Sequence, residues 1–318
     1  MNSFDAAPLI SIAVCTYNGE RYLAEQINSL LSQTWSNFEI IVVDDNSLDG
    51  TLEILKNFAA KDSRIKLYCN SKNLGIIKNF SLCMSLCRGE FIAPCDQDDI
   101  WHPEKLTKLH GVIGSHILAY CDSELISESG EPLNMRISDR LNMYEGNDPT
   151  VFTFWNCISG HAMLFERSLL DVAMPMPEVK FHDWWLAFMA ATFGEIKYLN
   201  EPLVQYRQHA SSQTDLSRTG QKKESGNRKR LFIERGEWIQ QLAKAPSLHK
   251  AFFVELHRLW LNQKNEWISI QIVRHLAKKS GSLLFINKNR SFMRFALKHL
   301  WGLKAKVFVS PSKYSDLV

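Results

Sequence analysis

Three carboxylates within four residues form the strongest chemical signal in this sequence: Asp96, Asp98 and Asp99 in the run DQDD. They follow an apolar segment, residues 91–93, that we expect to be a strand. Carboxylates this close repel one another unless a cation lies among them. Such a site suits Mg²⁺ or Mn²⁺, which commonly bridge to the phosphates of a substrate. The alternative is a solvated acidic turn before the helix that is predicted to begin near Pro103.

A second acidic pair, Asp44 and Asp45, follows another apolar segment, residues 38–43. At such a strand end in a nucleotide-binding sheet, a carboxylate commonly hydrogen-bonds a ribose or a base. The pair would also serve to cap the next helix, a role for which neighbouring polar residues compete. Because this pair lies at a neighbouring strand end, it weighs against a purely structural role for the DQDD run.

The segments that must position these carboxylates alternate between apolar runs and helical patterns. Four expected strands alternate with three expected helices: strands at residues 9–16, 38–43, 65–68 and 91–93, and helices at residues 20–32, 51–60 and 76–87. Continuous apolar strands are typical of sheets that are covered on both faces. This repeated unit predicts an α/β fold with a doubly wound parallel sheet. In such sheets ligands bind beyond the carboxyl ends of the strands, where both acidic clusters fall.

The rest of the chain shows a looser pattern. Further elements are expected: strands at residues 119–122, 162–165 and 203–206, a helix at residues 183–193, and a polar loop over the site at residues 137–150. A stretch rich in Ser, Gly, Lys and Arg, residues 211–230, predicts a linker. Only helical patterns follow it: residues 231–244, 248–276 and 292–308. We therefore predict a nucleotide-binding domain at residues 1–217 and a basic helical region at residues 218–318.

Several motifs, in this order, resemble those of the family 2 glycosyltransferases, which have the GT-A fold. They are ISIAVCTYNGERYL with LLSQTW, IIVVDDNSLDGT, NLGIIKNF, DQDDIWHPEKL, SGHAMLFER, FHDWWLAF and YRQHASSQT. The DQDD, HDWW and YRQH versions look most like the bacterial rhamnosyltransferases that build O-antigen and other surface polysaccharides. The resemblance implies a Rossmann-like, mostly parallel sheet flanked by helices, with a helical C-terminal extension.

The resemblance also implies roles for individual residues around a nucleotide-sugar donor. The residues implied to contact the nucleotide are Thr16, Tyr17, Asp45, Asn73, Lys78 and Asp96. Asp98 and His209 would hold the metal at the diphosphate, and Asp99 would reach hydroxyls of the donor sugar. Structural alternatives are open for three of these residues: Tyr17 as a core aromatic, Lys78 as a surface charge, and His209 as a capping or surface residue.

Within HDWW, the resemblance points to Asp183 as the catalytic base. Inverting transfer needs one carboxylate to take the proton from the acceptor hydroxyl as that hydroxyl attacks the anomeric carbon. Because Asp183 opens an apolar helix, it would also act as an N-cap and gain from the helix dipole. Of Trp184 and Trp185, we expect one to pack and one to line the sugar and acceptor site. His161 departs from the family, which often has Cys or Ala there, so its part in the acceptor site is open.

Composition excludes several other classes of protein. The chain has 318 residues, of which 45% are hydrophobic and 22% charged, as in ordinary globular proteins. No apolar run approaches the ~18 residues that span a bilayer, and the first ten residues, MNSFDAAPLI, lack the pattern of a signal peptide. Seven cysteines without framework spacing favour reduced thiols and a cytoplasmic location.

The net charge of +3 conceals an asymmetry, because basic residues predominate in residues 218–318 and acidic ones before them. The segment RSFMRFALKHLWGLKAK, residues 290–306, is basic and amphipathic. Such a helix suits the surface of an anionic membrane, where it would bring the enzyme to a lipid-linked acceptor. The alternative is a helical subdomain packed on the catalytic body. No fingerprint of a nucleic-acid-binding module is present, so we expect no nucleic-acid partner.

The sequence therefore predicts an inverting, metal-dependent glycosyltransferase. Our expected reaction carries L-rhamnose from dTDP-rhamnose to a glycan or lipid-linked acceptor in O-antigen or surface polysaccharide synthesis. One alternative keeps the enzyme but uses a UDP-hexose or UDP-N-acetylhexosamine donor. A second is a non-catalytic module that binds a glycan or a nucleotide sugar, and the presence of both Asp98 and Asp183 weighs against it. A third, a nucleotidyltransferase, would need a Gly-rich phosphate loop and basic residues, which YNGE after the first strand does not supply.

Overall fold

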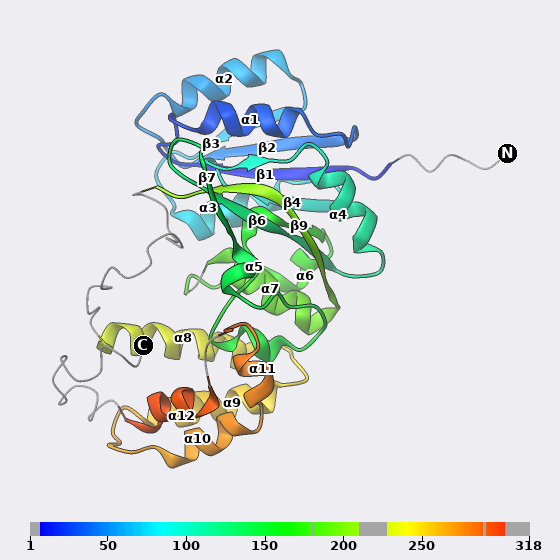
Figure 1. Ribbon diagram of the computed structural model, residues 1–318. Coiled ribbons are helices and arrows are strands. Elements are labelled where there is room, and N and C mark those ends of the chain that lie inside the picture. Colours follow the sequence, from blue (N-terminus) through cyan, green and yellow to red (C-terminus); the bar gives the residue numbers. More distant parts are fainter. Residues whose placement is uncertain (1–6, 180, 210–227, 289–290, 303–318) are drawn as a thin grey trace. The chain divides into compact units, whose positions relative to one another are not determined.

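The computed structural model describes residues 7–179, 181–209, 228–288 and 291–302 (Figure 1). The chain forms two compact units. One comprises Met1–Asn147 and Cys157–Ser217, and the other comprises Asp148–Asn156 and Arg218–Val318. The boundary predicted at residues 217 and 218, and most of the linker predicted at residues 211–230, lie outside the described residues. The assignment of Asp148–Asn156 to the second unit was not foreseen from the sequence.

A nine-stranded sheet forms the centre of the first unit (Figure 1). Its strands are hydrogen-bonded in the order β3-β2-β1-β4-β8-β6-β9-β5, and β7 pairs with β6 beside this path. The strands are β1 (Ile10–Thr16), β2 (Phe38–Asp44), β3 (Ile65–Cys69), β4 (Phe91–Cys95), β5 (Ile100–Trp101), β6 (Leu118–Ile126), β7 (Pro132–Arg136), β8 (Met163–Glu166) and β9 (Ile196–Arg207).

The sheet is parallel in its first half and mixed in its second. Strands β3, β2, β1 and β4 run parallel, as the alternation of strands and helices predicts. Beyond β4, β8 is antiparallel to both β4 and β6, whereas β6 and β9 are parallel. Parallel neighbours need a crossover connection, whereas antiparallel neighbours do not. The predicted α/β fold is confirmed, with more antiparallel pairing than a mostly parallel sheet implies.

Helices flank the sheet, and their apolar positions explain why they form. They are α1 (Leu23–Leu31), α2 (Thr51–Lys61), α3 (Ile76–Ser85) and α4 (Lys105–Ile113). Of these, α2 and α3 lie against strands of the parallel half of the sheet, and α4 lies against β6, β8 and β9. In α1, Leu23, Ile27 and Leu30 recur every three or four residues and are fully buried in the core. Every residue of β1 and β2 is buried, which accounts for their continuous apolar sequences.

The carboxyl ends of β1, β2 and β4 meet at one edge of the sheet. Thr16 and Asp44 are partners in the pairing of β1 with β2. Asp96 follows the last residue of β4, which also pairs with β1. Two later elements flank this part of the unit, the 3-10 helix η2 (Gly160–Ala162) and α7 (His182–Phe193); between them in sequence lies α6 (Leu169–Ala173). The two acidic clusters therefore lie at the edge where the parallel sheet was predicted to place them.

Residues 137–150 are more structured than the polar loop that we predicted. They contain α5 (Ile137–Arg140) and lead into the 3-10 helix η1 (Pro149–Thr153). Tyr144 is buried, its backbone N–H donates to the hydroxyl of Tyr120 (2.8 Å), and that hydroxyl donates to the Tyr144 carbonyl (2.9 Å). The stretch between α5 and η1 is a loop, as predicted, and the two short helices were not foreseen. The anchor comes from β6 and leaves no periodic pattern in the segment itself.

The second unit is helical, as predicted for the basic C-terminal region. Its helices are α8 (Arg228–Lys244), α9 (Lys250–Asn262), α10 (Ile270–Ala277), α11 (Ser280–Leu284) and α12 (Phe292–Leu300). Phe154 packs in its core with apolar residues of α8 to α12, and the indole N–H of Trp238 donates to the carbonyl of Thr153 (3.1 Å). These contacts explain why residues 148–156 belong to this unit.

Two of the helices predicted here have different lengths in the structure. The pattern at residues 248–276 forms α9 and α10, which a non-helical segment separates, and the pattern at residues 292–308 forms α12, which ends at Leu300. Residues 303–308 lie outside the described residues. Among the described helices, none combines the length and the apolar character that crossing a membrane requires.

Candidate functional site

Asp98 and His209, the two metal ligands implied by the resemblance, lie side by side. The Nε2 atom of His209 is 2.8 Å from Oδ2 of Asp98, and its ring packs against Tyr22 with centroids 5.1 Å apart. The two residues are 111 positions apart in sequence, and β5 and the end of β9 bring them together. A carboxylate oxygen and a neutral imidazole nitrogen are suitable ligands for Mn²⁺, and the carboxylate also suits Mg²⁺.

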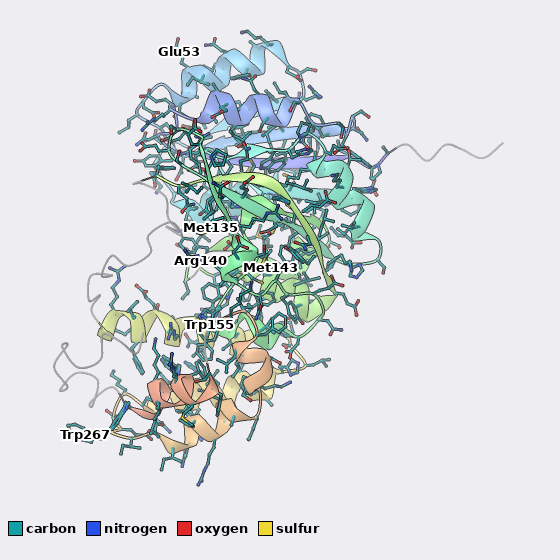
Figure 2. All side chains as sticks on the ribbon, in the orientation of Figure 1. Glu53, Met135, Arg140, Met143, Trp155 and Trp267 are labelled. Atoms are coloured by element: carbon teal, nitrogen blue, oxygen red, sulfur yellow. The ribbon has the colours of Figure 1, made fainter. Side chains whose placement is uncertain are left out.

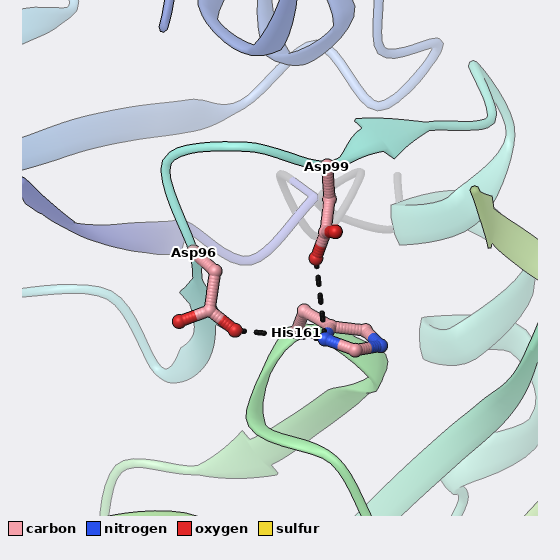
Figure 3. Close-up of side chains that lie close together, drawn as sticks. All are labelled: Asp96, Asp99 and His161. Carbon is pink, nitrogen blue, oxygen red and sulfur yellow. Dashed lines mark ion pairs between the residues drawn. The ribbon is translucent and has the colours of Figure 1, made fainter. Parts of the chain in front are cut away.

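A second cluster, of Asp96, Asp99 and His161, was not foreseen (Figure 3). The Nδ1 atom of His161 lies 3.2 Å from Oδ2 of Asp99 and 3.5 Å from Oδ2 of Asp96, in a geometry that could also hold a metal ion. The Nε2 atom of His161 lies 3.0 Å from the hydroxyl of Ser123. His161, which the sequence left without a clear role, is thus the centre of a buried network.

The two carboxyl groups of this cluster differ in their electrostatics. Asp99 is fully buried, and burial together with the charges of Asp98 and Asp96 raises its pKa well above the usual range. For Asp96, burial alone would raise the pKa, but the hydrogen bond and charge of His161 outweigh it and hold the pKa below the usual value. Asp96 is therefore the more readily ionised member.

The position of Asp99 differs from the sugar contact that we expected of it. One of its oxygens, Oδ1, accepts a hydrogen bond from the backbone N–H of Arg207 (3.1 Å), and the other faces His161. A fully buried carboxyl group supports the DQDD turn from the inside and does not meet a sugar in this geometry. The sequence could not show this, because the charged run looks the same whichever carboxylate points inward.

Arg207 is a further residue that sequence reasoning did not single out. Its guanidinium is buried, bonds Oε2 of Glu25 (2.6 Å) and the carbonyl of Asp98 (2.9 Å), and lies over the ring of Tyr22. These contacts tie the DQDD turn to α1 and to the end of β9. The YRQH motif, in which Arg207 precedes His209 by two positions, is the signal that could have indicated it.

Lys105, also missed from the sequence, anchors the turn that carries His161. Its side chain is fully buried, its Nζ donates to the carbonyl of His161 (2.6 Å), and the same atom lies 2.9 Å from the ring centroid of Trp101. Burial lowers the pKa of Lys105 to about 7. The neighbouring residue Gly160 donates its backbone N–H to Asp183. One buried lysine therefore fixes a turn that contacts both the acidic cluster and the expected base.

We expect Lys105→Met to lower kcat by about tenfold or more, because a displacement of catalytic groups by about 1 Å can lower a reaction rate by about a hundredfold. The substitution keeps the volume but leaves the His161 carbonyl without its donor. Lys108→Met is the matched control, because Lys108 makes only partly exposed ion pairs with Glu104 and Glu201. Steady-state kinetics on both variants is the measurement, and equal activities would show that the anchor is dispensable.

Asp183 lies in the first turn of α7, but the N-cap is Phe181, so the capping role that we expected of Asp183 was wrong. Its Oδ1 accepts a hydrogen bond from the backbone N–H of Trp184 (2.6 Å). Burial raises the pKa of Asp183 to about 7, the charge of Asp96 adds to the rise, and backbone hydrogen bonds from Trp184 and Gly160 oppose it. A carboxyl group whose pKa lies near neutrality is suited to accept a proton.

The residues next to Asp183 divide between packing and the site. Trp185 is buried, and its indole N–H donates to the carbonyl of Ala173 (2.7 Å), so it fills the interior and does not line a sugar site. Trp184 is half-buried. His182 is buried, stacks on Phe80 with centroids 3.7 Å apart, and neither of its ring nitrogens has a hydrogen-bond partner in the described part of the chain.

The residues expected to contact the nucleotide lie around the ends of β1 and β2. Thr16 donates to Oδ1 of Asp44 (2.8 Å). Asp45 is buried and accepts hydrogen bonds from the backbone N–H groups of Leu74 (2.8 Å) and Gly75 (2.9 Å), so it orders the loop before α3. The Tyr17 ring is exposed, which differs from its alternative as a core aromatic.

Asn73 and Lys78 lie in and after that loop. Asn73 accepts a hydrogen bond from the backbone N–H of Gly75 (3.1 Å), and Lys78 makes an exposed ion pair with Glu178 (3.0 Å). The position of Gly75 has φ of 83°, a conformation that favours glycine. The structure thus gives Asn73 a local role in the turn and gives Lys78 a surface role.

An α/β sheet that presents carboxylates and histidines beyond its parallel strands agrees with a GT-A glycosyltransferase, and the family match establishes this class. The family described as Glycosyl transferase family 2 matches residues 11–172, about half of the chain. The chain therefore belongs to that family, and the enzyme class and family inferred from the motifs are confirmed.

Relatives of the chain are named as glycosyltransferases. An uncharacterised glycosyltransferase of Haemophilus influenzae is 31% identical over 197 residues, 60% of this chain and 74% of that protein. Another from the same organism is 41% identical, but over 102 residues, only 32% of either chain. EpsH of Bacillus subtilis, named as a glycosyltransferase, is 27% identical over 297 residues, 89% of this chain and 82% of its own length.

Two solved structures share the fold. S. aureus TarS in complex with UDP-GlcNAc has a TM-score of 0.57 at 20% identity, over 86% of this chain and 81% of that one. The mannosyltransferase PcManGT from Pyrobaculum calidifontis, in complex with GDP-Man and Mn²⁺, has a TM-score of 0.51 at 16% identity, over 99% and 82%. At these identities the likeness establishes the GT-A fold and no particular substrate.

Proposed function

We propose that the chain is an inverting, metal-dependent glycosyltransferase that moves a sugar from a nucleotide-diphosphate donor to a hydroxyl of a glycan or a lipid-linked acceptor. The observation that carries the proposal is the association of Asp183, whose pKa is raised to about 7, with the turn that also holds the acidic cluster of Asp96 and His161. Asp96 belongs to the DQDD run, which also holds Asp98, the partner of His209 in the proposed cation site. A base close to a cation site supplies the two parts that this reaction needs.

The reaction would proceed as a single displacement. The acceptor oxygen forms a bond to the anomeric carbon, the bond from that carbon to the diphosphate breaks, and its electron pair leaves with the diphosphate. Asp183 takes the acceptor proton onto its carboxylate as the bond forms. A divalent cation, when bound, neutralises charge on the departing diphosphate. Asp98 and His209 would hold it, because their Oδ2 and Nε2 atoms converge within 2.8 Å of each other.

We propose L-rhamnose, supplied as dTDP-rhamnose, as the transferred sugar, on the resemblance of the DQDD, HDWW and YRQH motifs to rhamnosyltransferases. UDP-hexoses and UDP-N-acetylhexosamines are the alternatives. The solved structure of TarS contains UDP-GlcNAc and that of PcManGT contains GDP-Man, so the fold admits donors with different bases and sugars. Surface polysaccharide synthesis is the proposed context, supported by TuaG of Bacillus subtilis, a teichuronic acid biosynthesis glycosyltransferase that is 26% identical over 205 residues.

A donor panel tests the proposal. The full chain is incubated with dTDP-rhamnose, UDP-glucose, UDP-N-acetylglucosamine or GDP-mannose, each with Mg²⁺ or Mn²⁺, and release of the nucleoside diphosphate is measured. We expect release from dTDP-rhamnose to exceed that from the other donors by at least about tenfold, the scale on which a site distinguishes small differences between substrates. EDTA should stop the release.

Other outcomes of the panel have definite meanings. Release from a UDP-sugar and none from dTDP-rhamnose would replace the proposed donor and leave the enzyme class in place. Donor binding in calorimetry with neither hydrolysis nor transfer would support the non-catalytic module. Release that persists in EDTA would remove the metal from the proposal.

We propose that the enzyme is cytoplasmic and attaches to the inner face of the membrane. The support is the basic C-terminal region together with the absence of an apolar membrane-spanning helix among the described residues. An acceptor on a lipid carrier would require such proximity to a bilayer.

A further inference from the structure

The helical unit exposes an apolar stripe along α12 and the segment that pairs with its end. Met293, Leu297 and Trp301 recur every four residues and are 73%, 44% and 36% exposed. Residues four apart lie on one face of a helix. Ile268, which is 53% exposed, forms an antiparallel β-bridge with Trp301, so it extends the same stripe. We call these four residues the α12 stripe.

The aromatic face of α12 is buried inside the unit. Phe295 and His299 point into the core of the unit, where Phe295 is 2% exposed and packs against Phe154 with ring centroids 5.2 Å apart. Phe292 is partly buried against the same core. Most aromatic side chains of α12 are therefore unavailable to any partner, and the exposed apolar groups lie on the opposite side of the helix.

Further exposed apolar side chains lie next to the stripe in the chain. Trp267 and Ile270, both 54% exposed, flank Ile268 and the buried Ser269. Two backbone hydrogen bonds hold this segment against the end of α12: Ser269 N–H to the Leu300 carbonyl (2.7 Å) and Gly302 N–H to the Trp267 carbonyl (2.9 Å). Figure 2 shows Trp267 at the margin of the helical unit, pointing away from it. The exposed apolar groups are thus held on hydrogen-bonded backbone.

The charges around the stripe are almost all positive. On α12, Arg294 and Lys298 follow Met293 and Leu297 by one position. Arg274 on α10 and Lys278 just after it follow Ile270 at intervals of four. Arg274, Lys278 and Arg294 are exposed. Between residues 262 and 302 the sequence contains a single acidic residue, Glu266, against many Lys and Arg residues. A protein partner would need acidic residues placed opposite these basic ones. An anionic lipid surface carries negative charge over its whole area and so attracts them without such placement.

We infer that the α12 stripe docks the chain on an anionic phospholipid surface, with Trp301 and its apolar neighbours at the level of the headgroups and the basic residues at the phosphates. Tryptophan favours this interface, and each Lys or Arg near such a surface adds attraction that salt screens. The inference deepens the proposed function, since it rests on an acceptor that is carried by a lipid. It differs from a transmembrane anchor because the stripe lies on the outside of a folded helical unit.

The test is sedimentation of the full chain with vesicles, in the absence of donor and acceptor. Equal parts of phosphatidylcholine and phosphatidylglycerol form the anionic vesicles, and phosphatidylcholine alone forms the neutral ones. We expect M293Q/L297Q to bind the anionic vesicles about tenfold more weakly than the wild type, because two exposed apolar side chains no longer insert. The matched control is L248Q/V254Q, which replaces two exposed apolar residues of the same unit outside the stripe.

The outcomes decide the inference. It is overturned if the wild type ignores anionic vesicles, if it binds neutral vesicles equally well, or if both double variants lose binding to the same extent. A second copy of the chain would be the occupant if sedimentation velocity shows a wild-type dimer that M293Q/L297Q dissociates. Circular dichroism checks that the variants fold. Nucleotide release from the donor panel is measured in parallel, so loss of docking with full activity is distinguished from failure of the proposed function.

Discussion

Replacing Asp183 by Asn is expected to lower kcat by about a hundredfold to ten-thousandfold, the range that a positioned general base contributes. Asparagine keeps the shape of the side chain and can still accept the hydrogen bond from the Trp184 N–H, but it cannot take a proton. Donor binding, measured by calorimetry, should change little, because the proposed role of Asp183 is confined to the acceptor. Asp171→Asn is the matched control, since Asp171 is an exposed residue in the first turn of α6.

The pH dependence of kcat in the wild type is a second test of Asp183 as the base. The base works when it is ionised, and burial raises the pKa of Asp183 to about 7. Below this pH, kcat should fall about tenfold for each unit, while above it kcat should level off. A profile in Asp183→Asn that retains both the rate and the inflection would exclude Asp183 as the base.

Stability distinguishes a catalytic from a structural role for this residue. The pKa of Asp183 is higher in the folded chain than the ordinary value of 3.8, so the ionised form disfavours folding. This cost is absent below about pH 4, grows as the pH rises, and is complete above about pH 7. Asp183→Asn should therefore raise the melting temperature at pH 8 while it removes activity. A lower melting temperature would indicate that the carboxylate chiefly holds the turn.

The second large effect is expected from Asp98→Asn. If Asp98 and His209 hold the cation, the concentration of Mn²⁺ needed for half-maximal activity should rise by about tenfold to a hundredfold or more. Mutation of residues that only support a metal ligand already lowers metal affinity by that factor. His209→Asn should have the same direction of effect. Binding of Mn²⁺ in the presence of the nucleoside diphosphate gives an independent measurement, with Asp171→Asn again as the control.

The same measurement separates the two possible sites of the cation. Asp99→Asn and His161→Gln alter the buried cluster of Asp96, Asp99 and His161 and leave Asp98 and His209 in place. A normal Mn²⁺ response in Asp98→Asn together with a lost response in these two variants would move the metal to the buried cluster. Asp99 would then act as a ligand, in place of the supporting role that its burial indicates.

Much of the site could be predicted from the sequence because parallel strands end at a common edge. Asp44, Asp45 and the DQDD run each follow an apolar strand, and β1, β2 and β4 pair in parallel. Asp183 was indicated differently, by the resemblance of HDWW to the glycosyltransferase family, and it lies in the first turn of an apolar helix. These inferences depend on local patterns, and local patterns are what a single sequence contains.

The remainder depended on contacts between distant residues. Lys105 bonds a carbonyl 56 positions away, and Arg207 bonds a carboxylate 182 positions away. Neither residue differs in its local pattern from a surface charge, so the sequence could not show that both are buried. Asp99 was expected at the sugar for the same reason, whereas packing turns its side chain inward, and packing also decides that Trp185 is the buried member of its pair.

By itself, the sequence determined the alternation of strands and helices, the edge where the acidic residues gather, and membership of a glycosyltransferase family. The tertiary structure alone decided which carboxylate of DQDD is buried, that His161 joins two of them, and which face of α12 is exposed. The physical reason is that hydrophobic periodicity specifies which residues are buried within an element, whereas the pairing of buried polar groups is specified only when the elements pack.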